Sequence, residues 1–181
     1  HCAIADATGN PQFKRFLEYL GRFIIPRRTV WGSSAPPTNR AHLEAFQREV
    51  RERGFSHALL IGMGGSSLGP EVLAETFGSA RGFPRLTIID STDPGQIRAT
   101  EARIDLRNTL FIVSSKSGST LEPNVLKDYF FDKVGKAIGR DEAGQRFVAI
   151  TDPGSSMEKV AKADGFWRIF HGKPGIGGRY S

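Results

Sequence analysis

The stretch FIVSSKSGSTLEP, residues 111–123, decides the fold. It begins with aromatic and β-branched residues, as in a strand that is buried on both faces. Seven small or polar residues follow without a break, and Leu121 then opens a helical pattern. A buried strand that runs through a short polar loop into a helix is the unit from which doubly wound α/β sheets are built.

The same unit recurs on both sides of this stretch. Short continuous apolar runs alternate with helical patterns and indicate four further strands. We therefore predict an α/β fold with a doubly wound, mainly parallel five-stranded sheet that is flanked by helices on both faces. The further runs are HALLIG at 57–62, RLTIID at 85–90, RFVAIT at 146–151 and FWRIF at 166–170.

The chain is predicted to divide in two. Residues 38–181 contain all five strands, preceded by a helix that begins near Asn39. Residues 1–37 contain one predicted helix with Pro11 at its first position, and the prolines and basic residues after it indicate a helical arm or a linker.

Composition restricts the partners and the compartment. The 181 residues carry a formal charge of +6, and the basic residues are spread along the chain, so a small phosphorylated ligand is as plausible a partner as nucleic acid. Cys2 is the single cysteine, which excludes an internal disulfide and a cysteine-based zinc site and favours a cytoplasmic setting. No apolar run approaches the roughly 20 residues of a membrane span, and no signal pattern opens the sequence, so no membrane is expected as a partner.

The loop of the opening stretch offers more donors than a strand-to-helix turn needs. One hydroxyl is explained by a predicted capping box between Ser119 and Glu122. The remaining donors are typical of a phosphate cradle at a helix N-terminus. The donor groups of this loop belong to Ser115, Lys116, Ser117, Ser119 and Thr120.

The loop after the first strand, GMGGSSLGPEV at 62–72, is rich in glycine, which lets backbone N–H groups approach an anion. Pro70 is predicted to start the helix that follows. A plain turn without a ligand remains open, and so does dinucleotide binding with Asp90 as the ribose partner. The spacing speaks against the dinucleotide, because Ser67 stands where GxGxxG needs its third glycine.

Three motifs together resemble one known family. SKSGST at 115–120 resembles the sugar-isomerase (SIS) phosphate-binding motif, IGMGGSSLGP at 61–70 resembles the first glycine loop of glucose-6-phosphate isomerases, and IGGRYS at 176–181 resembles the start of that family's signature. The resemblance runs from about Phe55 to the end of the sequence and is strongest to isomerase domains that are fused to transaldolase.

The resemblance implies a binding site for a sugar phosphate. It places the phosphate on Ser115, Lys116, Ser117 and Thr120, and the sugar beside Gly64, Gly65 and Ser66. It implies no cofactor, no nucleic acid as a partner, and a homodimer for the full-length protein. Neither the chemistry nor the spacing of possible ligands indicates a metal.

The resemblance also implies the reaction, which interconverts glucose 6-phosphate and fructose 6-phosphate through an enediolate. Arg179 corresponds to the catalytic cation, which stabilises the developing oxyanion. The family's glutamate, histidine and lysine lie beyond this arginine, so we expect a polypeptide that continues past Ser181, and 181 residues that bind the phosphate without isomerising the sugar. Asp93 and Asp152, each followed by proline, are predicted to form turns or helix caps.

Two other function classes remain open. A non-catalytic SIS-type module that senses a phosphosugar would use the same two loops. A nicotinamide-dependent dehydrogenase is a third and more distant hypothesis.

Overall fold

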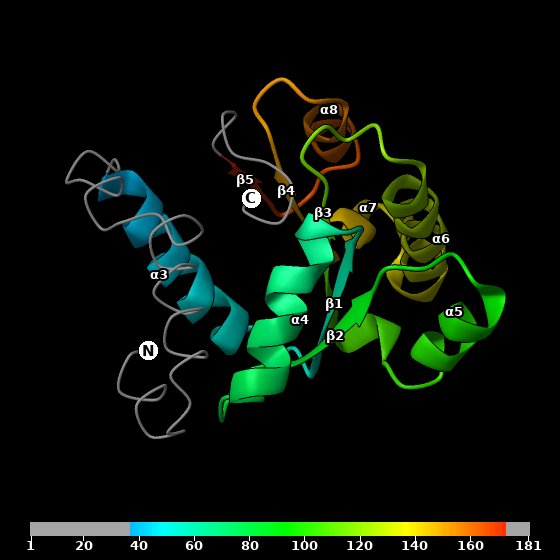
Figure 1. Ribbon diagram of the computed structural model, residues 1–181, viewed down its shortest axis with the longest axis horizontal. Coiled ribbons are helices and arrows are strands. Elements are labelled where there is room, and N and C mark those ends of the chain that lie inside the picture. Colours follow the sequence, from blue (N-terminus) through cyan, green and yellow to red (C-terminus); the bar gives the residue numbers. More distant parts are fainter. Residues whose placement is uncertain (1–36, 173–181) are drawn as a thin grey trace, which may run out of the picture. The chain divides into compact units, whose positions relative to one another are not determined.

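The computed structural model describes residues 37–172, and every statement about structure below concerns this range (Figure 1). Two compact units divide the chain, His1–Arg48 and Glu49–Ser181, and the whole sheet belongs to the second. The predicted helix at Pro11 and the IGGRYS segment with Arg179 lie outside the described residues.

The fold is α/β, as predicted. Five parallel strands form one sheet in the order β2-β1-β3-β4-β5. The strands are β1 (His57–Gly62), β2 (Arg85–Ile89), β3 (Thr109–Ser114), β4 (Phe147–Thr151) and β5 (Arg168–His171). The helices are α3 (Pro37–Glu52), α4 (Gly65–Phe77), α5 (Pro94–Glu101), α6 (Leu121–Ile138), α7 (Arg140–Ala143) and α8 (Ser156–Ala163), with short 3-10 turns η1 (Leu106–Asn108) and η2 (Gly144–Arg146).

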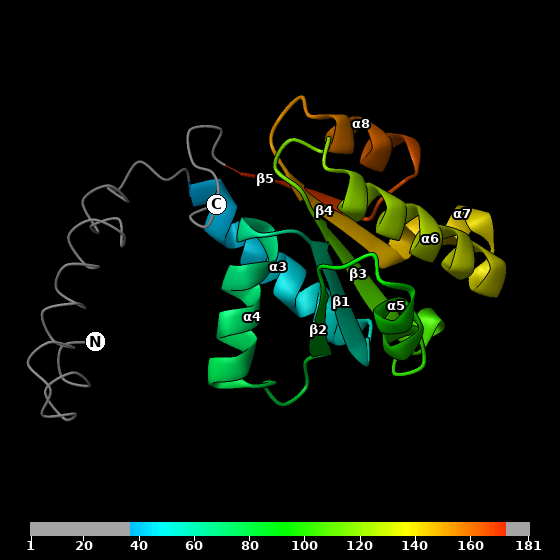
Figure 2. The same ribbon diagram turned by 45° about the vertical axis from the view of Figure 1, so that its right-hand side comes forward.

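The strand order places helices on both faces of the sheet. The connection from β1 to β2 runs in one direction, and the connections from β2 to β3, β3 to β4 and β4 to β5 run in the other. Because such crossovers are right-handed, α4 covers one face and α5, α6 and α8 cover the opposite one (Figure 2). The predicted doubly wound sheet is therefore confirmed.

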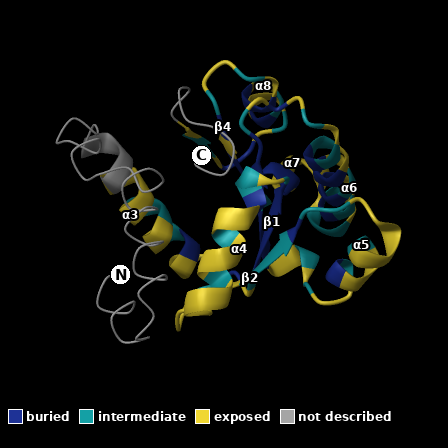
Figure 3. Cartoon of the chain, viewed as in Figure 1, coloured by how far each residue is buried: buried dark blue, intermediate teal, exposed yellow. Residues whose placement is uncertain are grey.

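The core lies between the sheet and α6. The rings of Phe111 and Phe147, on neighbouring strands, stack with their centroids 4.7 Å apart, and Phe130 of α6 packs on Phe111 at 5.5 Å. All three side chains are fully buried, while α4 keeps most of its surface exposed (Figure 3). Aromatic pairs of this kind each add roughly 0.5–1.5 kcal/mol beyond the burial of their area.

Several element boundaries differ from the predicted ones, and the largest difference is at the start of α4. Helix α4 starts at Gly65, so Pro70 lies inside the helix instead of opening it. The reason is Gly64, whose φ of +55° turns the chain into the helix directly after β1. The fifth strand starts at Arg168 and not at residue 166, because the backbone N–H of Phe166 still donates to the Ala161 carbonyl of α8, at 2.9 Å, and not to β4.

None of the helices in the described range is long and apolar enough to cross a membrane. Within the same range, no three side chains of histidine, cysteine, aspartate or glutamate gather as a metal site would require.

Candidate functional site

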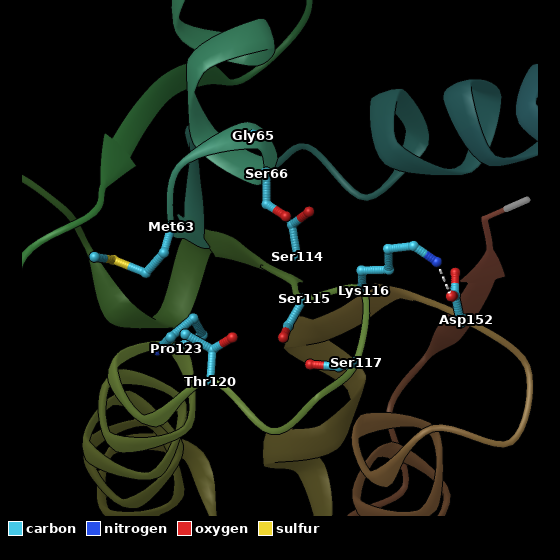
Figure 4. Close-up of a pocket in the computed structure, with 10 residues that line it drawn as sticks. All are labelled: Met63, Gly65, Ser66, Ser114, Ser115, Lys116, Ser117, Thr120, Pro123 and Asp152. Atoms are coloured by element: carbon cyan, nitrogen blue, oxygen red, sulfur yellow. Dashed lines mark hydrogen bonds and ion pairs between the residues drawn. The ribbon is translucent and has the colours of Figure 1, made fainter. Parts of the chain in front are cut away.

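The two loops singled out in the sequence meet at one end of the sheet. Gly62 and Ser114, the last residues of β1 and β3, are register partners. The chain reverses its direction of winding between these two strands, and ligands of open α/β sheets bind at such a switch point. An open pocket of about 330 Å³ lies there, lined by Met63, Gly65, Ser66, Ser114, Ser115, Lys116, Ser117, Thr120, Pro123 and Asp152 (Figure 4).

The loop after β1 brings the N-terminus of α4 to this pocket. Gly65 and Ser66 are the first two residues of the helix and both line the pocket, whereas Gly64 caps the helix without lining it. Ser67 is fully buried, and its hydroxyl donates a 3.0 Å hydrogen bond to the Gly64 carbonyl that closes the turn. The N–H groups of Ser66 and Ser67 donate to the carbonyl oxygens of Met63 and Gly64, at 3.2 Å and 3.1 Å, so what this turn offers an anion is mainly the positive end of the helix dipole.

Gly62 is required by the close packing of this end of the sheet. A Cβ atom at this position would lie 3.2 Å from the carbonyl oxygen of Ser114 and 3.2 Å from Cβ of Ser66. Glycine therefore allows the first turn of α4 to sit directly beside the end of β3.

The loop after β3 directs three hydroxyl groups into one space. Figure 4 shows the side chains of Ser115, Ser117 and Thr120 pointing toward one another across the loop. Thr120 is the N-cap residue of α6, yet its side chain makes no capping hydrogen bond. An N-cap threonine usually bonds the second or third N–H of its helix, so the Thr120 hydroxyl is left for another partner.

The predicted capping box is absent. The hydroxyl oxygens of Ser119 and Ser117 lie 2.8 Å apart, so Ser119 bonds within the loop and Thr120 takes the N-cap position. Glu122 does lie in the first turn of α6, where the helix dipole favours a carboxylate.

Asn124 and α8 hold the loop from two sides. The side-chain amide of Asn124 donates hydrogen bonds to the carbonyl oxygens of Gly118 at 2.9 Å and Thr120 at 2.7 Å. On the other side, the hydroxyl of Ser156 donates to the Ser117 carbonyl at 3.2 Å. Three carbonyl groups of the loop are thereby bonded to side chains of α6 and α8, which fixes the position of the loop.

Lys116 takes a different direction from the three hydroxyl groups. Its side chain leads away from them and forms an ion pair with Asp152 (Figure 4). The backbones of the two residues are also joined, since the Asp152 N–H donates to the Lys116 carbonyl at 3.0 Å. The Lys116 and Asp152 side chains are 32% and 20% exposed, so the pair lies at the wall of the pocket.

The prediction that Asp93 and Asp152 form turns or helix caps is confirmed: Asp152 opens a turn, in which its carbonyl accepts from the Ser155 N–H at 3.2 Å. Ser155 caps α8 by accepting from the Glu158 N–H at 3.1 Å, while the Asp152 carboxylate binds Lys116. Asp93 caps α5 and accepts from the Gln96 N–H at 2.8 Å. A sequence signal for Asp152 existed, because it follows β4 directly, as Ser115 follows β3.

The carboxylate of Glu158 is held by hydrogen bonds and ion pairs within the fold. The hydrogen bond from Lys162, together with that from the Gly154 N–H, lowers the pKa of Glu158 to about 2. His171 approaches the same carboxylate, with Nε2 3.3 Å from its oxygen. A carboxylate that is so strongly held in its ionised form is a poor proton acceptor near neutral pH.

The arrangement is suited to binding an anion. Among the described lining residues, Asp152 is the only acidic one, and Asp90, the candidate ribose partner, does not line the pocket. Hydroxyl groups, two helix N-termini and one lysine make a site that donates hydrogen bonds to negative charge.

Comparison with known proteins gives a consistent result. The profile of the phosphoglucose isomerase family matches residues 48–181. A glucose-6-phosphate isomerase of Trichormus variabilis is 41% identical over 156 residues, covering 77% of this chain and 28% of that protein, and one of Chlamydia trachomatis serovar L2 is 35% identical over 131 residues, covering 70% and 23%.

A solved structure is similar over the same part of the chain. The crystal structure of a glucose-6-phosphate isomerase from Chlamydia trachomatis D/UW-3/Cx superposes with a TM-score of 0.69 at 34% identity, over 77% of this chain and 26% of that one. The 181 residues thus span about a quarter of the length of these relatives.

Proposed function

This chain belongs to the phosphoglucose isomerase family, and we propose that its pocket binds the phosphate group of glucose 6-phosphate or fructose 6-phosphate. One observation carries the proposal: three hydroxyl groups converge at the N-terminus of α6, and that of Thr120 does no capping. Each hydrogen bond from such a donor to a charged phosphate oxygen contributes roughly 1.5–3 kcal/mol, and the helix dipole adds roughly 0.3–1 kcal/mol.

Ser115, Ser117 and Thr120 form the grip on the phosphate in this proposal. Lys116 adds a positive charge at the wall, shared with Asp152. The sugar extends toward the N-terminus of α4, beside Gly65 and Ser66, with Gly64 shaping the turn that brings these two residues to the pocket.

The chemistry rests on residues that the family resemblance supplies. Arg179 would stabilise the enediolate oxygen, and this stabilisation is greater in the transition state than in the ground state. The family's proton-transferring glutamate, histidine and lysine lie beyond the position of Arg179. We therefore propose that a polypeptide that carries these residues isomerises the sugar as a homodimer, and that residues 1–181 alone bind it without turnover.

A calorimetric titration of the 181-residue chain with fructose 6-phosphate tests the binding. Fructose without phosphate and NAD serve as comparison ligands. The Thr120→Val variant removes the hydroxyl with little change in shape, and because that hydroxyl caps nothing, the variant should fold normally. We expect about 10- to 100-fold weaker binding of fructose 6-phosphate, which corresponds to the loss of one charge-assisted hydrogen bond.

Thr76→Val is the matched control, since Thr76 is exposed on α4 and does not line the pocket. It should bind like the unchanged chain. Equal binding by the Thr120→Val variant, or binding of NAD in place of the sugar phosphate, would contradict the assignment of the pocket. Turnover by the 181 residues above that of Lys116→Ala and Arg179→Ala variants would contradict the proposed lack of activity.

A further inference from the structure

A second pocket lies at the opposite end of the sheet, next to the amino-terminal ends of the strands. Its volume is about 340 Å³. Three separate segments of the chain form it: the turn that leads into β1, the turn η1 before β3, and the α7–η2 segment before β4. The polar residues in its lining are Arg53, Arg107, Asn108, Glu142, Gln145 and Arg146.

The charge of this pocket is unbalanced. Three guanidinium groups line it against one carboxylate, Glu142, which forms no ion pair within the described range. The nearby Arg168 differs, because both carboxylate oxygens of Glu49 lie 2.9 Å from its terminal nitrogen. Like charges that are brought together by folding repel one another unless an anion lies between them.

Contacts within the fold occupy only part of the hydrogen-bond donors of Arg53 and Arg146. Arg53 donates to the Gln145 carbonyl at 3.1 Å and stacks on Trp167, with its guanidinium carbon 3.6 Å from the ring centroid. Arg146 donates through Nε to the carbonyl of Arg107 at 3.0 Å. A guanidinium has five N–H donors, so each of these two groups is fixed in position and still has most of its donors available.

The side chain of Arg107 has no such contact within the described range. It is exposed and makes no hydrogen bond or ion pair in the part of the chain that the structure describes. It joins the other two only through its place in the pocket lining. Burial and the charge of Arg146 lower the pKa of Arg53, and the carboxylate of Glu49 opposes this shift without reversing it.

We propose that this pocket is a second anion site, which binds a small doubly charged ligand that carries a phosphate group. Arginine is suited to this role because its planar fork bonds two phosphate oxygens at once. Arg53 and Arg146 are already oriented by their contacts, and Arg107 completes the site. Asn108 and Gln145 add neutral polar groups at the rim. The two pockets share no lining residue, so each proposal can be tested independently of the other.

Titration of the ¹⁵N-labelled 181-residue chain with inorganic phosphate tests this proposal by NMR. The backbone amides of Asn108 and Gln145 report on the second pocket, and those of Gly118 and Ser119 report on the first. Sodium chloride at matched ionic strength controls for screening of exposed charge. We expect saturable shifts at Asn108 and Gln145 with phosphate and not with chloride.

The Arg107→Gln variant removes one guanidinium group without breaking a hydrogen bond or ion pair of the described range. We expect about tenfold or weaker phosphate binding at Asn108 and Gln145, with unchanged shifts at Gly118. Arg103→Gln makes the same change of net charge at an exposed position outside both pockets and should have no effect. Shifts that chloride reproduces, the absence of shifts at Asn108 and Gln145, or undiminished binding in the Arg107→Gln variant would overturn the proposal.

Discussion

The Cα atom of Gly118 lies directly against the first turn of α8, so that a Cβ atom there would be 2.2 Å from the backbone nitrogen of Met157. Gly118 also has a φ of +70°, a conformation that side chains other than hydrogen disfavour. The hydroxyl-rich loop is therefore packed on a helix that follows it by almost forty residues, and no larger residue fits between them.

Gly118→Ala should displace the loop and weaken both stability and binding. The positive φ costs about 1–2 kcal/mol and the steric conflict with Met157 adds about 1–3 kcal/mol to the loss in unfolding free energy. Urea denaturation measures this loss, and titration with fructose 6-phosphate measures the effect on binding. Gly78→Ala separates the two costs, because Gly78 has a φ of +65° and nothing within 4 Å of its added Cβ. Equal losses in the two variants would show that the packing against α8 is unimportant.

Asn124→Ala should loosen the loop without touching the ligand. The variant loses the hydrogen bonds to the carbonyls of Gly118 and Thr120, each with a net contribution of about 0.5–1.5 kcal/mol. We expect unfolding free energy to fall by about 1–3 kcal/mol and fructose 6-phosphate to bind about tenfold more weakly. Asn108→Ala is the comparison variant, since the Asn108 amide donates a hydrogen bond to the Asp105 carboxylate at the opposite end of the sheet. If both variants bind the sugar phosphate normally, Asn124 has no positioning role.

Local pattern was sufficient to predict the sheet and the two loops, because buried parallel strands are continuous apolar runs. The run HALLIG matches β1 residue for residue. Six of the seven described residues predicted from the two loops line one pocket, and Gly64 alone does not. The strands depend on residues that are close in sequence, whereas the shared pocket follows from the pairing of β1 with β3, and its residues were predicted from the family resemblance.

The parts that the sequence did not predict depend on distant partners. The ion pair between Lys116 and Asp152 joins residues 36 positions apart, and only the pairing of β3 with β4 makes them neighbours. The capping box failed because the Ser119 hydroxyl found a partner in Ser117. The three arginines of the second pocket come from segments that no sequence pattern connects.

Acid should destabilise the fold through Glu158. Its pKa is about 2 in the folded chain and about 4.5 ordinarily, so its ionised form stabilises the fold above pH 4.5. This contribution is lost progressively as the pH falls from about 4.5 to about 2. Unfolding free energies of the unchanged chain and of Glu158→Gln should therefore differ most above pH 4.5 and converge toward pH 2. Glu75→Gln, at an exposed position on α4, should follow the unchanged chain at every pH, and parallel curves for Glu158→Gln would refute the assignment.

Asp152→Asn should strengthen the binding of fructose 6-phosphate. The carboxylate forms an ion pair with Lys116 and places a negative charge at the wall of a pocket proposed to hold a dianion. Removing it leaves the shape nearly unchanged and frees the lysine charge, which we expect to contribute roughly 1 kcal/mol, or about fivefold in affinity.

The gain from Asp152→Asn should shrink as salt is added, because partly exposed charges are screened. Asp141→Asn, on the exposed surface of α7, is the control for the change in net charge. Calorimetric titrations at two ionic strengths measure both effects. Weaker binding by the Asp152→Asn variant would reverse the interpretation, since it would mean that Asp152 holds Lys116 in the position from which it contacts the phosphate.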